Sequence, residues 1–173
     1  MQRLPLKQAK NIETVFNSAY WHLSQQDFTI AEIRLKLARK TENLEWIETV
    51  LTHLIDNRYI KNDLEFAIHF CESAFSNEMG KAAIPPKLTK RGISPRDIET
   101  ALELVIEREN IDFNELASNQ LTSRYLTFEG VSKEKVYAQM TNRGFSRQQI
   151  DQALAQHSER SSLRSKLEIS AEK

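Results

Sequence analysis

Hydrophobic residues recur at three- and four-residue spacing along most of this chain, with polar residues between them. In the segment 8–25, Val15, Ala19 and Leu23 follow one another at a spacing of four and so share one face of a helix. No clear segment shows the alternation of a half-buried strand. Four glycines and four prolines are too few for a sheet with many tight hairpins. The pattern therefore predicts an all-α fold.

One short pattern occurs three times, at intervals of 51 and 52 residues. It reads LARKTENLEWIETVL at 37–51, LTKRGISPRDIETAL at 88–102 and MTNRGFSRQQIDQAL at 140–154. A period near 50 residues that is kept at hydrophobic and turn positions is typical of a structural repeat. We therefore predict three tandem three-helix repeats in an extended, gently curved array. The predicted divisions are repeat 1 at 1–58, repeat 2 at 59–109, repeat 3 at 110–157 and a polar C-terminal tail at 158–173.

Each copy of the pattern encodes the end of one helix, a turn and the start of the next. Gly92 and Gly144 suit the left-handed residue that follows a helix end, which glycine adopts at low cost. Ser94 and Ser146 suit the cap of the next helix. Thr41 takes the glycine position in the first copy, so this turn is predicted to be strained or built differently. Further caps are predicted at Thr29 with Glu32, Asn43, Asp112 with Glu115, and Ser132.

The middle copy has a proline pair inside its expected second helix, in the stretch AAIPPKL. A proline removes a backbone N–H, and its ring clashes with the preceding turn. We therefore predict that this helix is short and begins near Pro85 or Pro86. Ile84, directly before the pair, is predicted to lie in extended geometry. The remaining helix of each repeat is predicted at 8–25, 63–78 and 112–127.

The charge, the cysteine content and the hydrophobic runs limit the kinds of protein to which this chain can belong. Lys with Arg and Asp with Glu both number 24, so the net charge indicates no partner. Cys71 is the only cysteine, which excludes an internal disulfide and a C-x-x-C site. The first residues lack the apolar run of a signal peptide, and no stretch approaches the ~18 apolar residues of a membrane span. We expect a cytoplasmic protein that does not enter a membrane.

Positive charge nevertheless gathers around the turn of every copy. Helix ends favour cations because the helix dipole is negative there, and solvated faces also carry them. The recurrence in all three copies supports a second interpretation, in which stacked repeats present a discontinuous basic surface to an acidic protein or to phosphates. The predicted partner contacts are Arg34, Lys36, Arg39, Lys40, Lys87, Lys90, Arg91, Lys133 and Arg143.

The sequence shows no recognisable catalytic or metal-binding pattern. Glu99, Glu103 and Glu107 are spaced at four, which is typical of a solvated helix face, and their charge disfavours insertion of this helix into a DNA groove. The four histidines show no H-E-x-x-H spacing, and no phosphate-binding glycine loop or nucleophile motif occurs. We predict that the protein is not an enzyme and has no catalytic residue, no metal and no cofactor.

Aromatic residues leave a further alternative open. Tyr20, Trp21, Trp46 and Tyr125 could stack on the bases of a single nucleic-acid strand. Trp46 fits the core better, because it stands near a helix start beside hydrophobic neighbours. Tyr20 and Trp21 are adjacent, so one of the two must turn outward.

These patterns together resemble the RecX family of bacterial regulators. LSQQDFTIAEIRLKL at 23–37 is similar to the family's L-S-x-R-D-x-S-x-x-E-L-x-x-K-L. YIKNDLEFAIHF at 59–70 is similar to Y-[IL]-[DN]-D-x-x-F-A-x-x-F with Lys61 inserted, and Arg58 stands where the family has glycine. LTKRGIS at 88–94 resembles L-x-x-[KR]-G-I-S, and the stretch 131–150 resembles the last family repeat. EMGKAAI at 78–84 departs from the family by lacking a proline and a basic residue.

The resemblance covers roughly residues 12–155 and implies a function. Members of the family bind RecA recombinase, which implies a monomer that lies in the groove of the RecA–single-stranded-DNA filament and bridges its subunits. It implies inhibition of the ATPase, recombinase and coprotease activities of RecA in DNA repair and SOS control, with at most weak DNA binding. Two alternatives remain: a helical-repeat nucleic-acid-binding protein independent of RecA, and a diverged scaffold.

Overall fold

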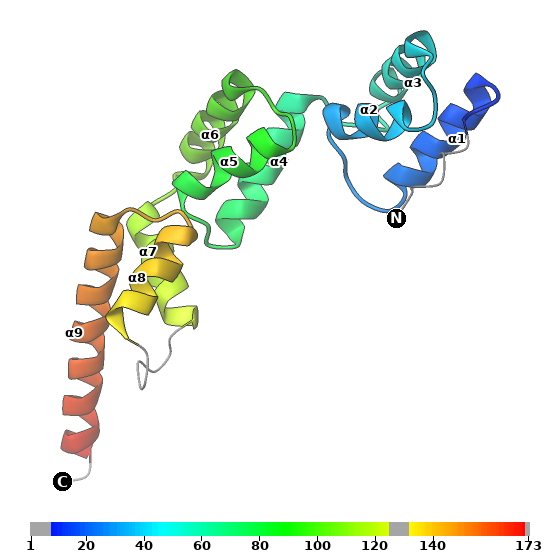
Figure 1. Ribbon diagram of the computed structural model, residues 1–173. Helices are drawn as coiled ribbons and strands as arrows, with labels where there is room; N and C mark the ends of the chain where they lie inside the picture. The colour runs from blue at the N-terminus through cyan, green and yellow to red at the C-terminus, as the bar shows by residue number, and fades with distance from the viewer. Residues whose placement is uncertain (1–7, 125–131, 172–173) are drawn as a thin grey trace, which may run out of the picture. The chain divides into compact units, whose positions relative to one another are not determined.

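A computed structural model describes residues 8–124 and 132–171, with side chains described up to residue 160. Within these ranges the chain forms α-helices and one 3-10 turn, and it contains no strand, so the all-α prediction is confirmed (Figure 1). The elements are α1 (Ile12–Leu23), α2 (Ile30–Ala38), α3 (Leu44–Asp56), α4 (Asp63–Ser76), η1 (Lys81–Ala83), α5 (Ile84–Lys90), α6 (Pro95–Glu109), α7 (Phe113–Arg124), α8 (Lys133–Asn142) and α9 (Arg147–Ala171).

The chain divides into two compact units. The first unit comprises Met1–His69 with Leu88–Ala101, and the second comprises Phe70–Lys87 with Leu102–Lys173. Helices α4, α5 and α6 contribute residues to both units. These two units do not test the predicted boundaries of the three repeats and the tail, which stay a prediction.

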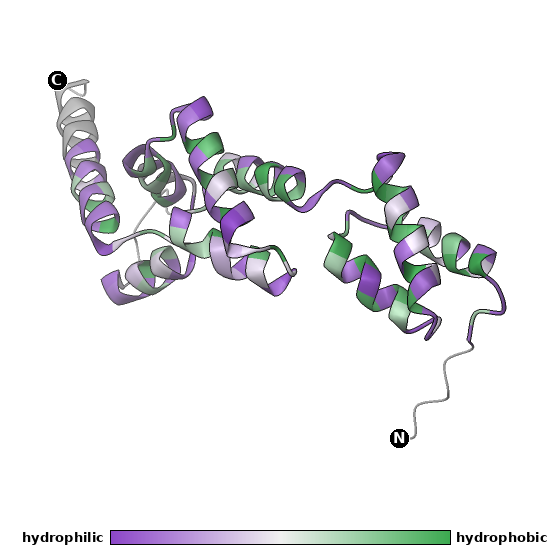
Figure 2. Cartoon of the chain, turned by 90° about the horizontal axis from the view of Figure 1, so that it is seen from above, coloured by the Kyte–Doolittle hydropathy of each residue, from purple (hydrophilic) through white to green (hydrophobic). Residues whose placement is uncertain are grey.

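The core of the first unit lies between α1, α2 and α3, which pack against one another (Figure 1). Hydrophobic and hydrophilic residues are mixed along these helices (Figure 2). Hydrophobic residues at a spacing of three and four residues give a helix one apolar face, which packs on its neighbours. Trp46 and Tyr20 pack against this core, whereas Trp21 is 61% exposed, which confirms both aromatic predictions. The buried residues are Val15, Ala19, Phe28, Ile33, Leu37, Ile47, Val50, Leu51, Leu54 and Ile60.

A second core joins α7, α8 and α9 in the second unit. Its buried residues are Ala117, Leu121, Val136, Met140, Phe145, Ile150 and Ala153. Helix α9 continues to Ala171 through the segment predicted as a polar tail. Helix α7 ends at Arg124, and Tyr125 with the rest of the segment to residue 131 lies outside the described residues.

The proline pair lies at the start of a short helix, as predicted. The 3-10 turn η1 precedes α5, whose seven residues begin at Ile84, one residue before Pro85. Pro85 and Pro86 occupy the first turn, where backbone N–H groups have no acceptor inside the helix, so their missing donors cost little. The extended geometry predicted for Ile84 is wrong: its φ of −76° and ψ of −52° are helical, because η1 has already turned the chain before it.

The predicted caps are present. Asn43 and Ser132 accept hydrogen bonds from Trp46 and Lys135, and Thr29 forms a reciprocal capping box with Glu32. Thr41 has no positive φ, and its hydroxyl accepts from the Asn43 N–H at 3.1 Å, so this turn is built differently, as predicted. The same cap, in which a side-chain oxygen accepts from the backbone N–H three residues later, begins three further helices. The pairs are Ser94 with Asp97, Ser146 with Gln149, and Asp112 with Glu115.

Arg58 follows the C-cap of α3 and has a backbone conformation that favours glycine, with a φ of +56°. A left-handed residue with a side chain costs about 1–2 kcal/mol relative to glycine. Because glycine also gains freedom in the unfolded chain, we expect Arg58→Gly to raise the free energy of unfolding by about 1 kcal/mol and Tm by roughly 2–4 °C. Thermal melts followed by circular dichroism measure the change.

Arg58→Ala is the matched control for this prediction. It removes the same exposed charge and keeps the Cβ atom that causes the strain. Equal Tm changes in the alanine and glycine variants would show that the backbone at residue 58 stores no strain.

Candidate partner-binding surface

The predicted partner contacts on α2 differ in what their side chains already bind. Arg34 forms an ion pair with Glu48 of α3, and the Lys36 ammonium lies 4.6 Å from the centre of the Phe28 ring. Arg39 is exposed at the end of α2 and forms no ion pair with a residue in the described ranges. On this helix, Arg39 is therefore the predicted contact most available to a partner.

Three further predicted contacts are also exposed. Lys87 and Lys90 lie on α5, and Lys133 begins α8. Within the part of the chain that the structure describes, none of them forms an ion pair. We call Arg39, Lys87, Lys90 and Lys133 the exposed cations. Lys40 is half-buried in the turn after α2.

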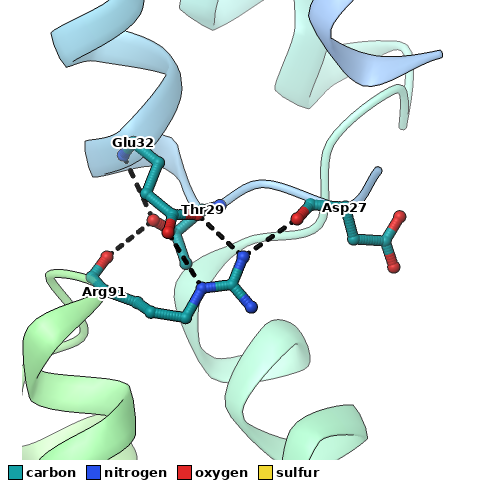
Figure 3. A network of polar contacts seen from close by, with 4 residues as sticks. All are labelled: Asp27, Thr29, Glu32 and Arg91. Carbon is teal, nitrogen blue, oxygen red and sulfur yellow. Dashed lines mark hydrogen bonds and ion pairs between the residues drawn. The ribbon is translucent and has the colours of Figure 1, made fainter. Parts of the chain in front are cut away.

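Arg91 has a different environment, because its turn packs on the segment that begins α2 (Figure 3). Its Nε donates to one Glu32 carboxylate oxygen at 3.0 Å, and a terminal nitrogen donates to the other oxygen at 2.8 Å. The same nitrogen donates to the Asp27 carbonyl oxygen at 2.9 Å. Thr29 Oγ1 donates to the Arg91 carbonyl oxygen at 2.7 Å. We call this contact, between Arg91–Gly92 and residues 27–32, the first joint.

The first joint shares its carboxylate with the capping box of α2. The Glu32 side chain accepts from the Thr29 N–H at 2.9 Å, while Thr29 Oγ1 accepts from the Glu32 N–H at 3.2 Å. Partial burial tends to raise the pKa of Glu32, but hydrogen bonds from Arg91 and Thr29 outweigh it and hold that pKa below its usual value. Glu32 is therefore ionised at neutral pH. Its carboxylate both caps the N-terminus of α2 and binds Arg91.

The Arg91 guanidinium also lies 4.4 Å from the centre of the Phe66 ring. The planar guanidinium of arginine can lie over an aromatic ring and form two parallel bonds to a carboxylate at the same time, and lysine cannot form the two parallel bonds. The Arg91 side chain is only 26% exposed. The residue predicted as a partner contact is thus already engaged in holding the first unit together.

Arg143 makes a matching contact in the second unit. Its guanidinium donates to the carbonyl oxygens of Asn77 and Glu78, the latter at 3.4 Å. The Gly80 N–H donates to the Arg143 carbonyl oxygen at 2.9 Å. We call this contact, between Arg143–Gly144 and residues 77–83, the second joint. Arg91 and Arg143 thus both bind main-chain carbonyls of a loop that follows a helix.

Glycines allow the backbones of the second joint to touch. Gly144 has a φ of +97°, and a Cβ atom there would lie 2.4 Å from the Ala83 nitrogen and 2.5 Å from the Gly80 oxygen. A Cβ atom on Gly80 would lie 2.3 Å from the Gly144 carbonyl carbon. In the first joint, Gly92 has a φ of +86°, and an added Cβ would meet the Ala31 methyl at 2.5 Å. The left-handed glycines were predicted, and their second role in close backbone approach was missed.

A signal for this second role is present in the sequence. Gly92 and Gly144 are 52 residues apart, at matching positions of the second and third copies. Ala31 and Ala82, which stands next to Ala83, are 51 residues apart, at matching positions of the first and second copies. Small residues at matching positions in two copies of a repeat are compatible with a close contact between those positions. Gly80 also takes a cap position without offering a side-chain acceptor, so its value there is its small size.

The remaining residues considered for chemistry lie on α6 and α4. Glu99, Glu103 and Glu107 are exposed on α6, as a solvated face requires. Burial, with help from the Glu72 carboxylate, raises the pKa of Cys71 to about 11, so the thiol is a poor nucleophile. Among the described residues, no group of His, Cys, Asp and Glu could hold a metal ion. No helix in the described ranges is long and apolar enough to cross a membrane.

Comparison with known proteins gives consistent relatives, although no family model matches the chain. The chain is 36% identical over 96 residues to the regulatory protein RecX of Photobacterium profundum, covering 56% of this chain and 36% of that protein. It is 29% identical over 143 residues to the regulatory protein RecX of Streptococcus gordonii, covering 79% of this chain and 53% of that protein. The chain therefore spans about half the length of these curated relatives, or less.

Solved structures show the same fold. The crystal structure of RecX from Lactobacillus salivarius matches with a TM-score of 0.63 and 25% identity, covering 84% of this chain and 95% of that chain. A second crystal structure of a regulatory protein RecX matches with a TM-score of 0.59 and 24% identity, covering 81% of this chain and 70% of that chain.

Proposed function

The chain belongs to the RecX family of regulatory proteins, and from this premise we propose that it regulates RecA by binding the RecA–single-stranded-DNA filament. The observation that carries the proposal is the set of exposed cations on helices of a RecX-like fold. Exposed cations are suited to an acidic protein surface and speed the encounter with it. The protein acts in this proposal as a regulator and not as an enzyme.

The proposed mechanism is steric. The chain lies along the filament as three repeats with the divisions predicted from the sequence, and successive repeats contact successive RecA subunits. Linked weak contacts of this kind give a high combined affinity, because each contact raises the effective concentration of the next. A bridge between subunits hinders filament growth, ATP hydrolysis, recombination and the cleavage of repressors that RecA promotes. No homo-oligomer is needed for this mechanism.

A titration of the protein into RecA filaments, with ATP hydrolysis as the readout, tests the proposal. Inhibition at protein concentrations far below those that saturate the DNA supports filament binding. Salt-sensitive DNA binding without inhibition supports the second candidate function, nucleic-acid binding independent of RecA, which the exposed cations would also serve. A chain that does neither is a diverged scaffold, and the proposal fails.

Reversal of two exposed cations should weaken the interaction with the filament. We expect Lys87→Glu with Lys90→Glu to reduce affinity roughly tenfold or more, because two attractive contacts with an acidic surface become repulsive. Both side chains are exposed on α5, so the fold should be unaffected. Fluorescence anisotropy of the labelled protein with RecA filaments measures the affinity.

The control pair Lys81→Glu with Arg160→Glu makes the same change in net charge at exposed positions outside the predicted contacts. Its affinity should stay within roughly threefold of the unmodified chain. Equal weakening by both pairs would show that only the net charge of the protein matters, and not the proposed surface.

A further inference from the structure

The carbonyl groups of three corresponding residues are each covered by an earlier part of the chain. Lys40, Arg91 and Arg143 occupy the same position in the three copies of the repeated sequence pattern. The Arg91 carbonyl accepts from Thr29 at 2.7 Å, and the Arg143 carbonyl accepts from Gly80 at 2.9 Å. The Lys40 carbonyl accepts from the Ala9 N–H at 2.7 Å. In its backbone, the turn at Lys40 therefore resembles the two joints.

The side chains at these positions differ in what they bind. Arg91 and Arg143 donate to main-chain carbonyls of the loops after α1 and α4, and Arg91 also binds a carboxylate. The segment that covers Lys40 offers it another cation, Lys10, in place of a carboxylate. In the described ranges the Lys40 ammonium forms neither an ion pair nor a hydrogen bond. Lys40 thus corresponds to two bound arginines but lacks their acceptors.

A pocket of about 400 Å³ opens beside Lys40 within the first unit. Its lining combines apolar and polar surface, and its charged side chains are both lysines. Ammonium groups of this kind are three-donor point charges on flexible stems, so they adapt to carbonyl and carboxylate oxygens presented by another molecule. The pocket, called here the Lys40 pocket, is lined by Gln8, Ala9, Lys10, Thr14, Ser18 and Lys40.

We propose that the Lys40 pocket docks an acidic loop of a protein partner, whose main-chain carbonyls and carboxylate bind Lys40 and Lys10 as residues 27–32 bind Arg91. The two joints supply the reason for choosing a protein, because at the corresponding positions of this chain the bound oxygens belong to loops of polypeptide. The volume of the pocket also suits a turn of a few residues, whereas a contact with a phosphate backbone needs only an exposed cation. This inference rests on the proposed function, in which the partner is RecA within its filament.

The first test is charge reversal in the full chain. Lys10→Glu with Lys40→Glu should weaken binding to RecA filaments on single-stranded DNA by roughly tenfold or more. The control pair Lys81→Glu with Arg160→Glu carries the same change in net charge and should bind within roughly threefold of the unmodified chain. Lys10→Gln with Lys40→Gln replaces the reversed variant should that variant fail to fold, with a smaller loss expected.

A crosslinking experiment identifies what enters the pocket. Ser18→Cys places a thiol in the lining, and a benzophenone maleimide should label it selectively because Cys71 is buried and its thiol pKa is about 11. Illumination on RecA filaments should give a covalent product with RecA protein. A product with DNA alone would overturn the inference in favour of a nucleic-acid contact.

The outcomes separate this inference from the proposed function. Filament binding that the Lys10 and Lys40 reversal leaves unchanged overturns the inference alone. Absence of filament binding by the unmodified chain overturns the proposed function, and the inference with it.

Discussion

Gly144→Ala is expected to destabilise the second unit by about 3–5 kcal/mol. Two costs add in this variant. The left-handed φ of +97° is unfavourable for any residue with a Cβ atom, and the new atom would lie 2.4 Å from the Ala83 nitrogen and 2.5 Å from the Gly80 oxygen. These neighbours are backbone atoms, so relief requires η1 or the turn before α9 to move. Urea unfolding followed by circular dichroism measures the loss.

The first joint supplies a matched comparison, because the neighbour of Gly92 is a side chain. An added Cβ on Gly92 meets the Ala31 methyl at 2.5 Å, and Ala31→Gly removes that methyl. We expect Ala31→Gly to restore roughly half of the stability lost in Gly92→Ala, leaving the cost of the left-handed backbone. In contrast, Ala83→Gly should not rescue Gly144→Ala, since the backbone contacts remain. Rescue in both joints, or in neither, would contradict the contacts described for the glycines.

Local features of the sequence predicted most of the fold. Helix spacing depends on residues three and four apart, and caps such as Thr29 with Glu32 depend on residues three apart, so both could be predicted from short stretches. Arg58 was noted only as a departure from the family glycine. Its left-handed backbone gives that departure a physical meaning, because glycine at this position would be free of strain.

The role of Arg91 could not be predicted in the same way. Its basic character suggested either a helix-end charge or a partner contact, and both interpretations use only neighbouring residues. Its actual partner, Glu32, is 59 residues away in the sequence, and nothing in either segment alone shows that they meet. For Ile84 the local rule itself failed. A residue before proline prefers an extended backbone, but the preceding turn η1 holds Ile84 in a helical one. Partner contacts are therefore best sought among cations whose long-range partners are absent.

Arg91→Ala is expected to lower the free energy of unfolding by about 2 kcal/mol at neutral pH. Truncation would leave the Glu32 carboxylate partly buried without its bidentate partner and would remove the contact with the Phe66 ring. The two charged side chains remain 26% and 27% exposed, so water can partly replace the lost bonds, and the cost stays below that of a fully buried pair. Arg91→Lys keeps the charge without the fork and should recover less than half of the loss.

The pH dependence distinguishes this ion pair from simple loss of packing. The pKa of Glu32 is lower in the folded chain than its usual value near 4.5, so the stability it contributes is present above about pH 4.5 and is lost as the pH falls through the folded value. The difference in unfolding free energy between the unmodified chain and Arg91→Ala should therefore be greatest near neutral pH and shrink in acid. Asp63 responds in the opposite direction, because burial and Asp97 raise its pKa, but it is present in both chains and cancels in the difference. A difference that stays constant from pH 7 to pH 3 would mean that Arg91 stabilises the joint through packing, and that its bonds to Glu32 add nothing.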